Sequence, residues 1–190
     1  MRRYFCLFLL VTGSLGASVP NPFIMGWGLL PPETLSAYLV GQNPQLDRGE
    51  ALKVAQVYVE ECSTEGINHD LAFAQMLLET SFLRFGGQVD SHQFNFAGLG
   101  ALDGGYKGLS FHDAREGIRA HIQHLKAYGS RLPLRNPLVN PRFYFVQRES
   151  APTVYDLSQR WASDPRYGVK IVTLMEKLHN FEQERNILTQ

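Results

Sequence analysis

Apolar residues recur at helical spacing through most of the chain, separated by polar residues. In the stretch 47–65, four apolar side chains fall on one helix face: Leu52, Ala55, Val59 and Cys62. The same spacing predicts further helices over the ranges 32–40, 113–129, 153–162 and 165–184. The pattern therefore predicts a mainly α fold.

The stretch from Asn68 to Gly87 differs from these because it is apolar on nearly every side. Asn68 can cap a helix start, and Gly86 with Gly87 can stop the helix. A helix of this kind is expected to lie buried at the centre of the fold. One carboxylate, Glu79, stands near its end.

Glu79 is the first candidate for chemistry. Glutamate is rarely buried without a partner or a task. Burial disfavours the charged carboxylate and raises its pKa, which suits a general acid near neutral pH. The alternative is an exposed glutamate on a helix that only resembles a buried one. Periodicity by itself leaves both interpretations open.

The character of the chain changes between residues 88 and 112. Glycines are dense there, helical periodicity disappears, and aromatic residues are scattered among polar ones. We interpret this segment as a glycine-rich loop lobe that follows the central helix, with a short β-hairpin around Gly104 and Gly105. Loops on a rigid helical scaffold commonly carry binding residues.

The N-terminus has the pattern of an export signal. Arg2 and Arg3 precede an apolar run from Tyr4 to Val11, and small residues follow. We expect a signal peptide over 1–17, an irregular N-terminal arm over 18–46 and a catalytic domain over 47–184. The apolar run is shorter than the ~20 residues of a membrane span. Whether the signal is cleaved or kept as an anchor stays open, and we expect no stable membrane span after processing.

Composition and motifs exclude several function classes. The chain of 190 residues has a formal net charge of zero, which argues against nucleic acid as the main partner. His121 and His124 have no further ligands at zinc spacing, so no metal is expected. Ser81 has no recognisable partner histidine, and no phosphate-binding glycine loop is present. We expect no cofactor. Once these classes are excluded, catalysis by a carboxylate is the remaining chemistry.

Four motifs in order resemble the glucosaminidase family of peptidoglycan endo-β-N-acetylglucosaminidases. The first is the helix with Gln75, Glu79 and Ser81, and the second is Asn95-Phe-Ala-Gly98. The other two are Phe111-His-Asp-Ala-Arg-Glu-Gly117 and Trp161-Ala-Ser-Asp-Pro-Arg-Tyr167. Together they extend from about residue 71 to residue 181.

The resemblance implies a lysozyme-like helical domain with a deep groove for the glycan strands of peptidoglycan. It implies hydrolysis of the β-1,4 bond on the reducing side of N-acetylglucosamine, with Glu79 as general acid. Tyr167 matches the family tyrosine near the reacting sugar. Four further residues match groove or supporting positions: Ser81, Asn95, Phe96 and Trp161. For Trp161, packing in the core is the stronger alternative.

One departure from the family pattern concerns the second carboxylate. Many members carry another glutamate in the mobile lobe, but no glutamate lies between Glu79 and Glu116. Asp103 is the best remaining candidate, although a turn aspartate is the simpler interpretation. If a second carboxylate activates water, the enzyme inverts the anomeric configuration. If none does, the 2-acetamido oxygen of the substrate can attack, and we lean to this mechanism.

Two other functions stay open at this point. A muramidase or lytic transglycosylase also places one glutamate at a helix end, although the Trp161–Tyr167 element argues against both. A non-catalytic glycan-binding module would keep the groove without turnover. In each case we expect an exported monomer, located in the periplasm or cell envelope or secreted.

Overall fold

The computed structural model describes residues 20–86, 89–101 and 107–188. Five α-helices make up most of this part: α1 (Pro32–Gln42), α2 (Arg48–Glu65), α3 (His69–Glu79), α4 (Ala114–Gly129) and α5 (Tyr167–Leu188). Three short 3₁₀ helices lie at Ser91–Gln93, Phe143–Phe145 and Val154–Leu157. Among the described residues, β structure is limited to isolated bridges. The predicted mainly α fold is confirmed.

Polar side chains set the helix starts where the sequence predicted them. Asp47 accepts a hydrogen bond from the backbone N–H of Glu50, and Asp113 accepts one from Glu116. Asn68 accepts from the backbone N–H groups of Asp70 and Leu71. Each cap satisfies an N–H that has no partner inside its helix. The starts of α2, α3 and α4 are therefore fixed locally.

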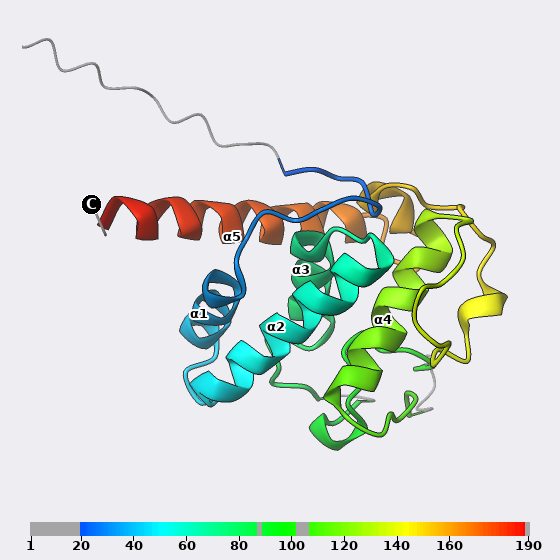
Figure 1. Cartoon of the computed structure of the whole chain (residues 1–190), viewed down its shortest axis with the longest axis horizontal. Helices are drawn as coiled ribbons and strands as arrows, with labels where there is room; N and C mark the ends of the chain where they lie inside the picture. Colours follow the sequence, from blue (N-terminus) through cyan, green and yellow to red (C-terminus); the bar gives the residue numbers. More distant parts are fainter. Residues whose placement is uncertain (1–19, 87–88, 102–106, 189–190) are drawn as a thin grey trace, which may run out of the picture.

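Helix α3 lies at the centre of the molecule, packed between α2 and α5 (Figure 1). Most of its apolar residues are fully buried, among them Leu71, Phe73, Met76 and Leu77. The long α5 crosses one side of the molecule, and α4 packs against α2 (Figure 1). The prediction of a buried central helix is confirmed, and burial of this apolar surface is the main source of stability.

The central helix ends earlier than predicted. It stops at Glu79, and Ser81, Phe82 and Leu83 follow with left-handed φ angles of 50°, 60° and 57°. Thr80 stabilises this turn because its hydroxyl accepts from the N–H of Leu83 and donates to the Met76 carbonyl. The expected extension to the glycine pair is thus wrong, and Glu79 occupies the last turn of α3.

Of four other predicted segments, one is shorter than expected, two lie outside the described residues and one contains a helix. The helix expected over 153–162 forms only the 3₁₀ turn Val154–Leu157, because Ser158 leaves the helical conformation. Gly104 and Gly105, with the hairpin expected there, lie outside the described residues, as does the signal segment 1–17. Within the arm expected over 18–46, α1 forms and Ile24 and Leu30 are buried in the core.

A buried aspartate attaches this N-terminal segment to the helices. Asp70 accepts from the backbone N–H groups of Leu29 and Leu30 at 2.9 and 3.2 Å, and His179 of α5 lies 3.0 Å away. Burial would raise the pKa of Asp70, but the hydrogen bonds from His179 and Leu29 more than offset this and lower it.

In the part of the chain that is described, no helix combines the length and apolarity needed to cross a bilayer.

A buried ion pair joins α2 to α4. The Nζ atom of Lys126 lies 2.6 Å from Oε2 of Glu65, and both side chains are almost completely inaccessible to solvent. Glu65 also accepts from the backbone N–H groups of Arg135 and Asn136. The pair therefore fixes the end of α2, the face of α4 and the connection that follows α4.

Candidate active site

Glu79 and Tyr167 meet at the ends of two helices. Glu79 is the last residue of α3, and Tyr167 is the first residue of α5. The Tyr167 hydroxyl donates a hydrogen bond to Oε1 of Glu79. The Trp161 side chain forms a second hydrogen bond to the same carboxyl. Residues far apart in the sequence thus converge on one half-buried acid.

The environment of Glu79 favours its protonated form. Burial raises the pKa of the Glu79 carboxyl, and the hydrogen bonds from Tyr167 and Trp161 offset only part of this rise. A carboxyl whose pKa is raised keeps its proton closer to neutral pH. That property is what proton donation to a leaving group requires.

The loop after the 3₁₀ turn Ser91–Gln93 approaches the other oxygen of Glu79. Gly98 adopts a left-handed φ of 61°, and a Cβ atom built on it would lie 3.3 Å from Oε2 of Glu79. A side chain at this position would face both backbone strain and a close contact. Glycine therefore lets the backbone pass directly beside the carboxyl.

Asn95 holds this loop in place. Its Oδ1 atom accepts from the N–H of Leu99 at 2.9 Å, and its Nδ2 donates to the carbonyls of Leu99 and Leu109, each at 2.9 Å. The side chain is 1% exposed. Asn95 was predicted as a substrate-binding residue, and the structure uses its amide inside the loop that carries Gly98.

A chain of buried polar side chains extends from Tyr167 into the core. Nε2 of Gln75 donates to the Tyr167 hydroxyl at 2.8 Å, and Oε1 of Gln75 lies 2.9 Å from Nε2 of His121. Nδ1 of His121 lies 2.9 Å from the hydroxyl of Tyr58. Gln75, His121 and Tyr58 are all fully buried. The chain thus joins α3, α4, α5 and α2.

When Glu79 is ionised, the direction of every bond in this chain is determined by the carboxylate at one end and the neutral His121 near the other. An ionised Glu79 only accepts, so Tyr167 donates to it and accepts from Gln75. The Gln75 oxygen then faces His121, which must carry its proton on Nε2. Burial lowers the pKa of His121 to about 3, so its Nδ1 is unprotonated and accepts from Tyr58. All four donors point toward Glu79.

The remaining predicted site residues are placed as follows. Phe96 is 4% exposed and packs edge to face against Tyr58. Ser81 is exposed in the left-handed turn after Glu79. Trp161 follows the 3₁₀ turn Val154–Leu157 and packs against His121 and His124. It also contacts Glu79, so the same side chain belongs to the core and to the site. Asp103 lies outside the described residues.

Sequence reasoning missed the inner part of the site. Gln75 precedes Glu79 by one helical turn in an otherwise apolar helix, and a buried amide there requires partners. His121 was considered only as a metal ligand. The useful signal was the pair of polar residues one turn apart on the central helix, which marks a face directed at other polar groups.

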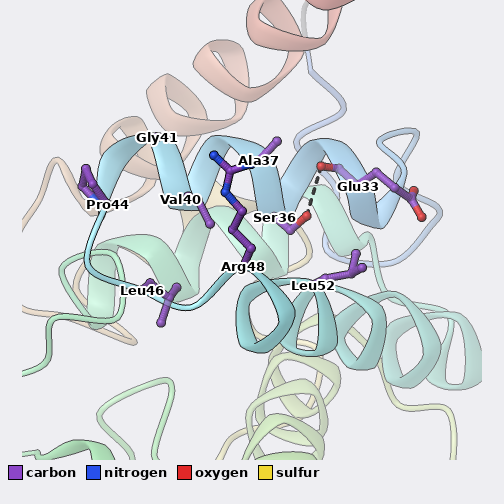
Figure 2. Close-up of a pocket in the computed structure, with 9 residues that line it drawn as sticks. All are labelled: Glu33, Ser36, Ala37, Val40, Gly41, Pro44, Leu46, Arg48 and Leu52. Carbon is purple, nitrogen blue, oxygen red and sulfur yellow. Dashed lines mark hydrogen bonds between the residues drawn. The ribbon is translucent and has the colours of Figure 1, made fainter.

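A cavity away from this site carries no comparable chemistry. It occupies about 610 Å³ between α1 and the start of α2, and Figure 2 shows its lining. Val40, Leu46 and Leu52 make it largely apolar, with Glu33 and Arg48 as its charged residues. No titratable cluster like that around Glu79 is present among these described lining residues.

Comparisons with known proteins identify the family of the chain. The model of the glucosaminidase family, described as mannosyl-glycoprotein endo-beta-N-acetylglucosaminidase, matches residues 55–180. An uncharacterized protein of Borreliella burgdorferi (strain ATCC 35210) is 46% identical over 157 residues, which cover 83% of this chain and 77% of the relative. No solved structure matches the chain. The matched range contains Glu79, Gly98 and Tyr167, and the chain belongs to the glucosaminidase family of glycoside hydrolases.

Proposed function

We propose that this protein is an exported endo-β-N-acetylglucosaminidase that cuts the β-1,4 bond on the reducing side of N-acetylglucosamine in peptidoglycan. In this proposal Glu79 protonates the leaving oxygen. The supporting observation is the half-buried carboxyl at the end of α3, with a raised pKa and hydrogen bonds from Tyr167 and Trp161. The basic and apolar residues at 2–11 support export.

The attacking group in this proposal is the substrate itself. The motivation is the sequence, which has no glutamate between Glu79 and Glu116, where many members of the family carry a second one. The 2-acetamido oxygen then attacks C1 as the bond to the leaving oxygen breaks and Glu79 delivers its proton. Water then attacks C1 of the resulting oxazolinium ring, which opens the ring, and gives one proton to Glu79. Two displacements at C1 retain the β configuration, so an α anomer released first would contradict this mechanism.

Digestion of purified peptidoglycan tests the bond that is cut. We expect the purified protein to release fragments with reducing N-acetylglucosamine ends, identified by reduction and mass spectrometry. Reducing N-acetylmuramic acid would instead identify a muramidase, and anhydro ends would identify a lytic transglycosylase. Binding to peptidoglycan without any new ends would support a glycan-binding module. Each of these three results would contradict the proposed activity.

Replacement of Tyr167 by Phe is expected to change both rate and pH dependence. The variant loses a hydrogen bond to a charged group, and a loss of roughly 10–100-fold in kcat corresponds to the usual strength of such bonds. That bond lowers the pKa of Glu79, so its removal raises this pKa. Activity that needs protonated Glu79 should then persist to higher pH. The measurement is kcat as a function of pH.

Tyr38 offers the matched control for this variant. It is also a buried tyrosine, but it packs against Phe181 at the other end of α5. Tyr38→Phe should therefore leave the pH profile in place. An unchanged basic limb in Tyr167→Phe, or an equal shift in both variants, would show that the Tyr167 hydroxyl does not act on Glu79.

A further inference from the structure

A second groove flanks the candidate acid. It occupies about 600 Å³ along the seam between the end of α3 and the first half of α5, a size typical of ligand sites. Leu78 and Ser81, which stand on either side of Glu79 in the sequence, line one wall. Arg166, which immediately precedes Tyr167, lines the other. Glu79 and Tyr167 are not among its lining residues, so the groove adjoins the helix ends that carry them and does not contain the carboxyl itself.

The charge of the groove is one-sided. Its charged lining residues are all cationic, namely Arg84, Arg166, Lys170 and Lys177, and no described lining residue carries a carboxylate. The chain as a whole has equal numbers of basic and acidic residues, 18 of each. The excess of positive charge is thus a local property of this seam. Such a surface attracts anionic groups.

Most of this charge is available to a ligand. Lys170 forms an ion pair with Asp164, whereas Arg84 donates to the carbonyls of Ser81 and Gln42, which neutralise no charge. Lys177 is exposed two turns beyond Lys170 on the same side of α5. The groove therefore presents cations at several points along its length.

The uncharged lining of the groove is mostly apolar. Leu77, Leu78, Val169 and Leu174 contribute to its lining together with Phe82. A lining that combines apolar side chains with cations suits a short, extended molecule that carries small apolar groups and several carboxylates. A sugar chain without charge would leave the cations unused. A peptide with free carboxylates matches both parts.

The chemistry of peptidoglycan supplies such a peptide. N-Acetylglucosamine is uncharged, and the lactyl carboxyl of each muramic acid is consumed in the amide bond to its peptide stem. The negative charge of the polymer therefore lies on the carboxylates of the stems. We infer that this groove binds the acidic peptide stem next to the bond that is cut. This inference rests on the proposed function and names the part of the substrate that the site recognises.

Comparison of two substrates tests this inference. Wild type and Lys177→Glu are assayed on intact peptidoglycan and on glycan strands whose stems have been removed with an amidase and whose freed lactyl carboxyls have been converted to neutral methylamides. We expect wild type to show the lower KM on the stem-bearing substrate. Lys177→Glu should raise that KM by about 3–10-fold, the usual scale for one exposed charge contact. Its kinetics on stem-free strands should not change.

Lys53→Glu is the matched control because Lys53 is an exposed lysine of α2 outside the groove. It makes the same change in net charge and should alter neither KM. Equal KM values of wild type on both substrates, or an equal effect of Lys177→Glu on both, would overturn the stem-binding inference while hydrolysis continues. If wild type cleaves neither substrate, the proposed function itself fails, and the inference fails with it.

Discussion

Replacement of Glu79 by Gln should lower kcat on peptidoglycan by about 10²–10⁴-fold, the usual contribution of a general acid. Gln has nearly the same shape, and its amide oxygen can still accept from Tyr167, but it has no proton to give to the leaving oxygen. Substrate binding should change little, because the proton matters only in the transition state. The measurement is the release of reducing ends under saturating substrate.

Two controls make this result specific. Glu176→Gln changes an exposed glutamate of α5 and should retain wild-type activity. A thermal unfolding curve should show that Glu79→Gln is folded, since burial of a neutral amide removes a desolvation cost. Activity of Glu79→Gln within tenfold of wild type would exclude Glu79 as the acid. Unchanged binding with no activity in either form would instead support a glycan-binding module.

Replacement of Lys126 by Met should cost roughly 3–5 kcal/mol of unfolding free energy, because it leaves the Glu65 carboxylate buried without a cation. The pair is 2.6 Å apart and almost fully enclosed, so water cannot take the place of the ammonium group. For a chain of this length the loss corresponds to a decrease in Tm of roughly 6–20 °C. Calorimetry or circular dichroism would measure it.

A second substitution separates charge from packing. Glu65→Gln added to Lys126→Met removes the stranded charge and keeps an oxygen for the backbone N–H of Asn136, which Glu65 accepts in the wild type. The double variant should therefore regain much of the lost stability. The exposed pair between Arg131 and Glu149 is the contrast, and Arg131→Ala should cost less than about 1 kcal/mol. Equal losses in Lys126→Met and Arg131→Ala would contradict this account.

The sequence predicted the scaffold well because short-range features determine it. The caps at Asp47, Asn68 and Asp113 act within one helical turn, and the burial of α3 follows from apolar residues on all its sides. Gly66 adopts a left-handed φ of 74° at the end of α2, as a helix-ending glycine does. These features need no knowledge of tertiary contacts.

The errors and omissions have two causes, a local turn without a sequence signal and contacts between distant segments. The stop of α3 at Glu79 depends on a left-handed turn of ordinary residues that Thr80 stabilises, and no glycine marks it. The partnership of Gln75 with His121 crosses 46 positions, and that of Tyr58 with His121 crosses 63. Periodicity predicts the helix face on which a residue lies, but it does not predict which other helix packs against that face. The role of Glu79 and Tyr167 as acid and partner stays a prediction for kinetics.

The aligned hydrogen bonds behind Tyr167 have an electrostatic consequence. Because every donor from Tyr58 onward points the same way, their bond dipoles add, and the positive end of the sum lies at Glu79. The same carboxyl occupies the last turn of α3, where the helix macrodipole presents its negative end. The hydrogen-bond chain favours the ionised carboxylate of Glu79, and the helix macrodipole favours its protonated form. The pKa of Glu79 is thus set by two opposed electrostatic effects. A change in the hydrogen-bond chain or in helix α3 would shift this pKa without any contact with the substrate.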